Sequence, residues 1–414
     1  MTLRRTTIAL AVALALIPAT EAAAQSEGAL AGKLRSAMRS AGASSGAYVE
    51  NADTGKPVFR FRYSRPRILA SNTKLYTTAA ALARFGVEGR LATEVRGSGE
   101  LELDGTWRGN LYLVGGGDPT FGSRRFARRT YGAGGTVEEL AALLETAGIE
   151  RVTGRVFGDE SRFDSRRGGP ESAFRISPYV GPLSGLSYNR GLATESGRGY
   201  QSNPPAFAAA RLDSALARRE ISVKGAARAG RTPADARVLA TVQSPTMTRL
   251  AAITNKPSDN FFAEMLLKDL AAQAGGVGTT AGGARLAARF ARRIGGRPSR
   301  LADGSGLSRA NRASPYRVVK LLVAMRKRDE FDPFFASLSI AGRDGTLRPR
   351  MRRGPARRRC RGKTGTISGV SALSGYCRAR SGQTYAFSIL MNNVNPFGAR
   401  AIQDRMLHAI AGLR

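Results

Sequence analysis

The sequence predicts an α+β fold in which strands from both ends of the chain share one sheet and a mostly-β region is inserted between them. Alternating apolar and polar residues over 44–63 indicate a hairpin near the N-terminal end. Apolar runs at 369–376 and 385–391 indicate strands near the C-terminal end, with helical spacing between about 260 and 328. Terminal strands with helices between them are typical of a layer in which the two ends pair.

The first elements are bounded by turn and stop residues. The hairpin turns at Asp53-Thr54-Gly55. From Ser71 to Phe85, apolar residues such as Leu75 and Leu82 recur at helical spacing, and Gly86 follows. We therefore expect a helix that begins at Ser71 and ends before Gly86.

The inserted region differs from the rest of the chain in its sequence pattern. Short strand-like runs at 111–114, 152–157 and 238–242 lie among turns rich in Gly, Pro and Arg, with one helix at 137–147. Further helices are expected at 260–274, 280–294, 314–328 and 399–413. The predicted organisation is a leader at 1–24, a catalytic domain at 25–94 and 245–414, and one or more inserted domains at 95–244.

Residues 1–24 have the pattern of a secretory signal peptide. Arg4 and Arg5 form a basic start, residues 7–17 are apolar, and Ala22-Ala23-Ala24 is a small-residue cleavage site. No later segment offers about twenty uninterrupted apolar residues. We expect export to the periplasm or cell-wall space and a mature chain from Gln25 without a transmembrane helix; the alternative is a leader retained as an anchor.

The formal charge of +34 is a very large basic excess, and the leader carries only +1 of it. A basic surface attracts polyanions without specifying a fold. Because export removes most nucleic acid from reach, we expect anionic envelope polymers as partners and no nucleic acid. The densest run, Arg343 to Arg361, is either a contact for such a polymer or a solvated loop. A base-composition bias toward Arg is the alternative source of the excess.

Cys360 and Cys377 are the only cysteines, in a chain expected to reach an oxidising compartment. If 359–366 and 371–378 are antiparallel neighbours turning at Ser368-Gly369, the two cysteines lie directly opposite each other, within reach of a disulfide. A disulfide and two free thiols both remain open. No metal-ligand spacing surrounds either cysteine, and we expect neither a metal nor a cofactor.

Three short motifs carry the chemistry, and they occur in one order. They are Ser71-Asn72-Thr73-Lys74, then Ser258-Asp259-Asn260, then Lys363-Thr364-Gly365. Each alone is common as a cap, a turn or a strand end. Together they form the set found in penicillin-binding proteins and class A β-lactamases.

The first motif predicts an activated serine. Positions three apart share one face of a helix, so the Lys74 amine can reach the Ser71 hydroxyl. Lys74 can act as a base if burial or a nearby cation such as Lys363 lowers its pKa. The backbone N–H of Ser71, at the helix start, and that of Thr366 are predicted to hold a developing oxyanion.

The other two motifs are predicted to position the substrate and relay protons. Ser258 offers a hydroxyl for a proton to the leaving amine, and Asn260 an amide that orients the substrate or the lysine. Lys363 and Thr364 are expected to hold the free carboxylate of a substrate that ends in one.

Beyond these motifs, the chain resembles the low-molecular-mass class C penicillin-binding proteins of the D-alanyl-D-alanine carboxypeptidase/endopeptidase type. The likeness covers most of residues 44–395, and the 183 residues between Lys74 and Ser258 leave room for the insertions of that branch. Segments that carry it include Gly115 to Thr120, Gly158 to Asp164, Asp303 to Arg309, Asp344 to Leu347 and Leu373 to Tyr376.

The resemblance implies a penicillin-binding, β-lactamase/transpeptidase-like catalytic domain with two inserted domains. It implies hydrolysis of D-Ala-D-Ala termini or D-Ala cross-links of peptidoglycan stem peptides, with β-lactam antibiotics as inhibitors. Ser71 carries over as the acylated nucleophile, Lys74 as its base, Ser258 and Asn260 as the second motif, and Lys363 as the substrate binder.

Two alternatives remain open at this point. A β-lactamase on the same scaffold would release penicillin quickly, although the long insertion argues against it. A basic, non-catalytic protein that binds the cell wall would not need Ser71, Lys74 and Lys363, all of which are present.

Overall fold

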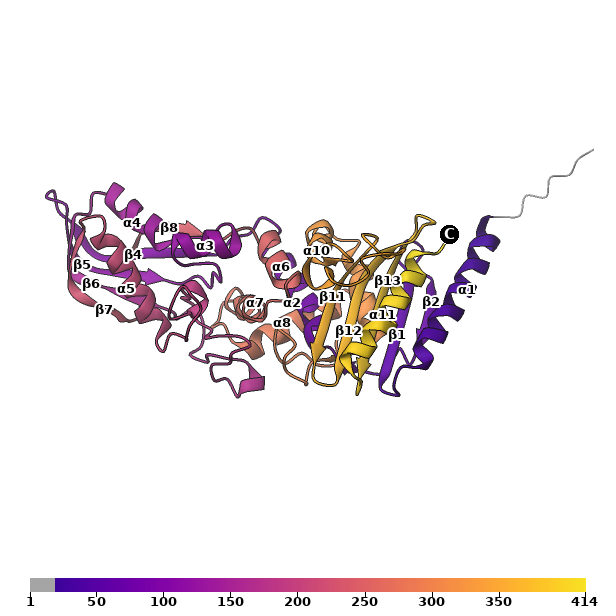
Figure 1. Cartoon of the computed structure of the whole chain (residues 1–414). Coiled ribbons are helices and arrows are strands. Elements are labelled where there is room, and N and C mark those ends of the chain that lie inside the picture. The colour runs from indigo at the N-terminus through magenta and orange to yellow at the C-terminus, as the bar shows by residue number, and fades with distance from the viewer. Residues whose placement is uncertain (1–18) are drawn as a thin grey trace, which may run out of the picture.

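The structure is a computed structural model that describes residues 19–414, of which Figure 1 gives the whole arrangement. Most of the predicted leader, residues 1–18, lies outside the described residues. The first helix, α1 (Ala19–Arg39), includes the predicted cleavage point near Gln25. The molecule is elongated, with the inserted region at one end and the two chain-terminal portions together at the other (Figure 1).

The terminal portions share a six-stranded sheet in the order β10-β11-β12-β13-β1-β2. β1 pairs antiparallel with β13, which confirms that strands from both ends of the chain lie in one sheet. The hairpin predicted at 44–63 is β1 and β2. The strands are β1 (Ser45–Asn51), β2 (Pro57–Phe61), β10 (Ser339–Ile340), β11 (Cys360–Ile367), β12 (Val370–Arg378) and β13 (Thr384–Asn392).

Helices cover both faces of this sheet, and alternation along the strands decides which residues face which layer. In β1, Val49 packs with α1 and α11, whereas Tyr48 packs on the opposite face with α2 and α9. Figure 1 shows α11 lying across the sheet beside α1. The helices of this domain are α2 (Thr73–Phe85), α6 (Met247–Asn255), α7 (Asn260–Ala272), α8 (Thr280–Arg293), α9 (Pro315–Met325), α10 (Phe331–Ser337) and α11 (Pro396–Ala411).

Short elements complete the catalytic portion. β3 (Arg67–Ile68) pairs with β9 (Arg312–Ala313), which brings the chain to the 3₁₀ turn Ala70–Asn72 just before α2. A second 3₁₀ turn, Gly345–Leu347, follows β10. The helix predicted from Ser71 therefore begins as a 3₁₀ turn, and its α-helical part starts two residues later, at Thr73.

The insertion has its own sheet and core, and it contains more helix than the sequence predicts. The sheet has the order β7-β6-β5-β4-β8, with Trp107 and Leu111 buried beneath its helices. The unforeseen α5 starts at Pro204-Pro205 behind an Asn203 cap; proline suits the first turn of a helix, and alanines continue it. The elements are β4 (Ala92–Leu101), β5 (Thr106–Val114), β6 (Arg151–Asp159), β7 (Ser222–Ala229), β8 (Arg237–Gln243), α3 (Arg124–Tyr131), α4 (Val137–Thr146) and α5 (Pro204–Ala217).

The insertion's strands form a single sheet, whereas the resemblance implies two inserted domains. The segment between β6 and α5 contains only the 3₁₀ turns Pro170–Ser172 and Asn189–Gly191 as helical elements. This irregular segment reaches back to the catalytic portion. The division of the chain at 95 and 244 stays a prediction.

Cys360 and Cys377 are bonded to each other in the structure. They are directly opposed in the β11–β12 pair, which confirms the register expected from the sequence. Both are fully buried against the layer of α1 and α11. The disulfide therefore ties the start of β11 to the end of β12.

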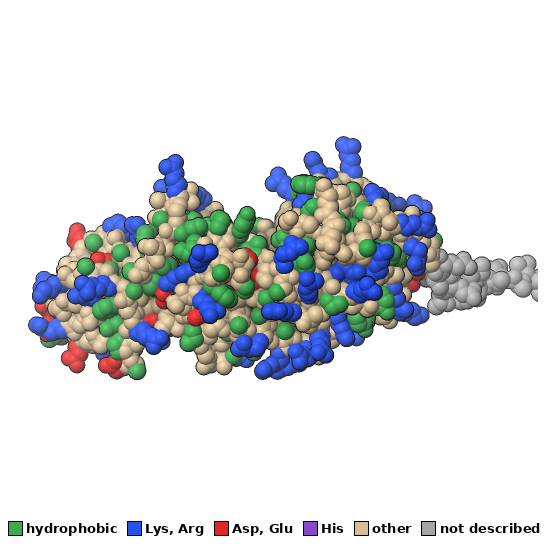
Figure 2. All heavy atoms as spheres, turned by 90° about the horizontal axis from the view of Figure 1, so that it is seen from below, with side chains coloured by type: hydrophobic (Ala, Val, Ile, Leu, Met, Phe, Trp, Pro, Cys, Tyr) green, Lys and Arg blue, Asp and Glu red, His purple; other side chains and the backbone are tan. Residues whose placement is uncertain are grey.

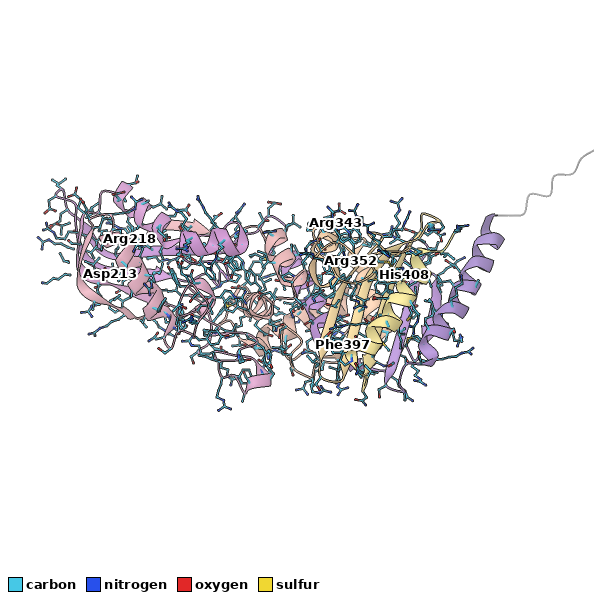
Figure 3. The ribbon with its side chains drawn as sticks, viewed as in Figure 1. Asp213, Arg218, Arg343, Arg352, Phe397 and His408 are labelled. Atoms are coloured by element: carbon cyan, nitrogen blue, oxygen red, sulfur yellow. A yellow bond between two sulfur atoms is a disulfide. The ribbon has the colours of Figure 1, made fainter. Side chains whose placement is uncertain are left out.

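The surface carries Lys and Arg side chains along its whole length (Figure 2). The Arg-rich tract connects β10 to β11 beside α11, and Figure 3 labels Arg343 and Arg352 of this tract together with His408 of α11. Both labelled arginines are exposed, whereas Arg350 pairs with Asp404 at 2.6 Å. Across residues 19–414, no helix has the length and apolar character needed to cross a membrane.

Candidate active site

Ser71 and Lys74 lie at the N-terminal end of α2. Ser71 occupies the 3₁₀ turn and Lys74 the first turn of the α-helix, so both side chains point the same way. The Lys74 Nζ donates to Ser71 Oγ at 3.0 Å. Ser71 is partly exposed, whereas Lys74 is fully buried. The hydroxyl is thus open to a ligand while the amine beside it is shielded from water.

Lys74 is held by two further acceptors. Its Nζ lies 2.7 Å from Asn260 Oδ1 and 2.7 Å from the backbone oxygen of Ser305. Burial lowers the pKa of Lys74 to about 8, against the opposing effect of the carboxylates of Asp303 and Glu264. An amine with this pKa is half neutral at about pH 8, and its neutral form can accept a proton from Ser71.

Lys363 and Ser258 form a second pair. The Lys363 Nζ donates to Ser258 Oγ at 2.8 Å and to the backbone oxygen of Thr364 at 2.9 Å. Burial, and then the positive charge of Lys74, lower the pKa of Lys363 well below its usual value. The sequence predicted that Lys363 would help to lower the pKa of Lys74, but the largest cause at Lys74 is burial.

Asn72 joins the nucleophile turn to the strand of the third motif. Its Nδ2 donates to the backbone oxygen of Lys363 at 2.9 Å. A Cβ on Gly365 would lie 2.9 Å from Leu69 O and 3.0 Å from the backbone nitrogen of Ser71. Only glycine lets β11 approach the nucleophile turn this closely. The third motif is thereby placed against the first.

The register of β11 places backbone groups at its open edge. The bond from Arg378 N to Arg359 O flanks the Cys360–Cys377 pair, so these two residues do not bond each other through their backbones. Every second residue from Cys360, up to Thr364 and Thr366, then turns its N–H and C=O away from β12. β10 covers that side only at 361–362, which leaves the backbone of Thr364 and Thr366 facing an unpaired edge.

The side chains of these two threonines have other partners. Thr364 Oγ1 donates to Thr346 Oγ1 at 2.7 Å, so its hydroxyl is oriented from the turn after β10. Thr366 is exposed, and its Oγ1 accepts from Arg400 at 3.4 Å. The role of the Thr366 backbone N–H as an oxyanion donor stays a prediction.

Sequence reasoning missed the support beneath Lys74. Glu264 Oε1 accepts from the backbone nitrogens of Gly304 and Ser305 at 3.0 and 2.7 Å, and Asp303 accepts from Gly306 N at 2.8 Å. Both acids are fully buried, and burial followed by their mutual repulsion raises the pKa of Glu264. They shape the loop whose Ser305 carbonyl faces Lys74. The segment 303–309 was noted for its resemblance, but Glu264 sits in an ordinary helical pattern.

Solved structures that resemble this chain include a penicillin-binding protein and a peptidase. Penicillin binding protein 4 from Haemophilus influenzae matches with a TM-score of 0.76 and 20% sequence identity, over 90% of this chain and 97% of that one. A predatory endopeptidase from Bdellovibrio bacteriovorus matches with a TM-score of 0.56 at 18% identity, over 89% and 94% of the two chains. At these sequence identities the likeness shows the fold alone. It is the α+β fold of the penicillin-binding and β-lactamase-like proteins.

The curated relatives are carboxypeptidases. A D-alanyl-D-alanine carboxypeptidase from Actinomadura sp. is 28% identical, over 88% of this chain and 80% of the relative. Carboxypeptidase DacB from Mycolicibacterium smegmatis is 31% identical, over 86% and 77%. The D-Ala-D-Ala carboxypeptidase 3 (S13) family model matches residues 29–197 and 200–412. With all three motifs gathered at one site and these matches spanning nearly the whole chain, the protein belongs to the D-Ala-D-Ala carboxypeptidase 3 (S13) family of serine peptidases.

Proposed function

We propose that this protein hydrolyses D-Ala-D-Ala termini, D-Ala cross-links, or both, in peptidoglycan through an acyl-enzyme on Ser71. The observation that carries the proposal is the buried Lys74 amine 3.0 Å from a partly exposed Ser71 hydroxyl. Membership of the family and the names of the curated relatives support the substrate class.

Acylation begins when neutral Lys74 takes the proton of the Ser71 hydroxyl. Ser71 Oγ then attacks the carbonyl carbon of the penultimate D-Ala, and the backbone N–H groups of Ser71 and Thr366 hold the oxyanion. The C–N bond breaks as the leaving amine receives a proton through Ser258. Water then cleaves the ester on Ser71 and regenerates the hydroxyl.

Lys363 and Thr364 hold the substrate's terminal carboxylate in this proposal. Burial, followed by the charge of Lys74, penalises the protonated form of Lys363 and lowers its pKa. A carboxylate arriving beside it favours the protonated form, because an opposite charge nearby raises the pKa of an amine. Binding of the free acid and protonation of Lys363 thus reinforce each other.

The test is the mass of the intact protein after incubation with benzylpenicillin, followed by peptide mapping and by release of D-Ala from an acyl-D-Ala-D-Ala peptide. We expect one persistent penicilloyl group on Ser71, release of D-Ala, and loss of both in Ser71→Ala. Rapid turnover of penicillin without an adduct would support a β-lactamase instead. No adduct and no hydrolysis would leave a non-catalytic wall-binding protein.

The leader pattern at 1–24 and the basic surface support two further parts of the proposal. The protein is exported to the periplasm or cell-wall space, and its exposed arginines bind anionic envelope polymers by charge. Sedimentation with purified cell walls should decrease steeply as salt is raised from 50 to 300 mM, because the Debye length, about 10 Å at 0.1 M, shortens as salt rises. Binding that ignores salt would contradict the electrostatic part.

A further inference from the structure

The inserted region contacts the second motif at two places. Asn260 Nδ2 donates to the backbone oxygen of Tyr179 at 3.0 Å. The Asp259 carboxylate accepts two bonds from the Arg190 guanidinium, at 2.6 and 3.2 Å. Tyr179 and Arg190 both belong to the irregular segment between β6 and α5. Asp259 and Asn260 of the second motif therefore both form hydrogen bonds with residues of the insertion.

Asp259 has a second task, which is to start α7. Its Oδ1 also accepts from the backbone nitrogen of Phe262 at 3.0 Å, so the side chain caps the helix. Asn260 is the first residue of that helix, and its Oδ1 is the acceptor for Lys74. A contact that holds Asp259 in place therefore also holds Asn260 Oδ1, which accepts from the Lys74 amine.

Arg190 lies in a strained turn, and its side chain packs against an aromatic ring. Arg190 and Asn189 both have a positive φ, 60° and 49°, a conformation that is disfavoured for residues other than glycine. Asn189 Oδ1 accepts from Ser123 N at 2.9 Å, which holds this turn to the start of α3. The Arg190 guanidinium lies 4.9 Å over the Phe261 ring, with the side chain 24% exposed.

Ser258 is strained as well. Its φ of 66° is in the left-handed region, where a serine is disfavoured. A short, two-bonded ion pair on the next residue opposes the relaxation of this peptide unit. The hydroxyl that faces Lys363 is thereby kept in place.

We propose that Arg190 is a positioning residue for the acylation step, acting through Asp259 on Asn260 and Lys74. The insertion thereby supports the site where α6 ends and α7 begins. This inference rests on the proposed acylation of Ser71. Arg190 also balances the charge of Asp259, a carboxylate that acts on the Lys74 amine.

The charge of Arg190 should affect the pH midpoint of acylation, which a purely structural role of Arg190 would leave unchanged. Without Arg190, the uncompensated Asp259 carboxylate favours protonated Lys74, so the pH midpoint of acylation rises. Without the Asp259 charge, that midpoint falls. Arg190→Lys keeps the charge but loses the two-bonded geometry, so the rate decreases while the midpoint stays.

The experiment measures the second-order rate of acylation by benzylpenicillin from pH 6 to 10, together with the thermal midpoint, in the full chain. The variants are Arg190→Ala, Arg190→Lys and Asp259→Asn. The matched control is Arg167→Ala, because Arg167 pairs with Glu160 at similar exposure within the insertion and contacts no motif residue. We expect Arg190→Ala to reduce the rate roughly ten- to a hundredfold and to raise the pH midpoint.

Arg167→Ala should lower thermal stability alone. If Arg190→Ala behaves like this control, with an unchanged rate and midpoint, the inference is wrong while the proposed function stands. If Arg190→Ala does not fold, a lowered midpoint in Asp259→Asn together with a reduced rate at an unchanged midpoint in Arg190→Lys supports the inference, and wild-type rates and midpoints in both variants overturn it. If the wild-type chain forms no adduct, the proposed function itself fails.

Discussion

Lys363 Nζ lies 2.8 Å from Ser258 Oγ, although 105 positions separate the two residues in the chain. One comes from strand β11 and the other from the loop between α6 and α7. The third motif thereby meets the second at the site that holds Ser71 and Lys74.

Acylation should depend on pH through Lys74. The base is active when neutral, and its pKa is about 8, so the acylation rate should rise from pH 6 and level off above about pH 9. The measurement is the rate of penicilloyl formation across this range. Lys74→Ala should lose the rise together with most of the rate. A wild-type rate that stays flat from pH 6 to 9 would argue against Lys74 as the base.

Lys363→Ala should remove the preference for substrates with a free carboxylate. A hydrogen bond to a charged group contributes about 1.5–3 kcal/mol, so kcat/KM for the free acid should fall roughly ten- to a hundredfold. The matching peptide amide lacks the carboxylate and should lose much less. Lys320→Ala serves as the control, because Lys320 pairs with Glu50 and not with a residue of the three motifs. Equal losses for acid and amide would show that Lys363 does not bind the carboxylate.

Reduction of the Cys360–Cys377 bond should cost stability and leave the chemistry intact. The cysteines are 17 positions apart, a loop for which a disulfide contributes about 3 kcal/mol. Denaturant unfolding of Cys360→Ser/Cys377→Ser against the wild type measures this loss. The acylation rate should stay within about twofold, because the bond lies at the opposite end of β11 from Thr366. A large loss of rate in folded protein would contradict this separation.

Stability should decrease as pH rises from 5 to 8 because of Asp118. Burial raises the pKa of Asp118 to about 7, against the hydrogen bonds from Thr120, and burial also raises the pKa of neighbouring Asp269 to about 7. A carboxyl with a raised folded pKa stabilises the fold while protonated, and this stability is lost as pH rises through the folded pKa.

Asp118→Asn isolates this effect, because the amide oxygen can still accept from Thr120 while the side chain no longer titrates. The wild type should lose about 2–3 kcal/mol more than the variant between pH 5 and 8, measured by denaturant unfolding. Other titrating groups, such as Arg162-paired Asp269, remain in both proteins. Identical pH dependence in the two would refute the role of Asp118.

Much of this protein can be predicted from local sequence pattern. The terminal hairpin, the helix after Ser71 and the opposed cysteines follow from spacing within short segments, where alternation and turn residues act directly on the backbone. The three motifs name the lysines and hydroxyls of the site, because serine acyl transfer needs a nucleophile, a base and polar groups that hold the substrate. The helix α5 was missed because its Pro204-Pro205 start resembles a turn as much as a helix.

Only the tertiary structure decides how these groups are supported. Ser305 contacts Lys74 through its backbone carbonyl, and a backbone contact cannot be predicted from the pattern of side chains. Glu264 of α7 accepts a hydrogen bond from the backbone nitrogen of the same Ser305. Arg190 meets Asp259 although 69 positions separate the two residues in the chain. The sequence by itself determined which residues can react. Burial and long-range contacts, which depend on the packed chain, decided the pKa of Lys74 and the placement of Asn260.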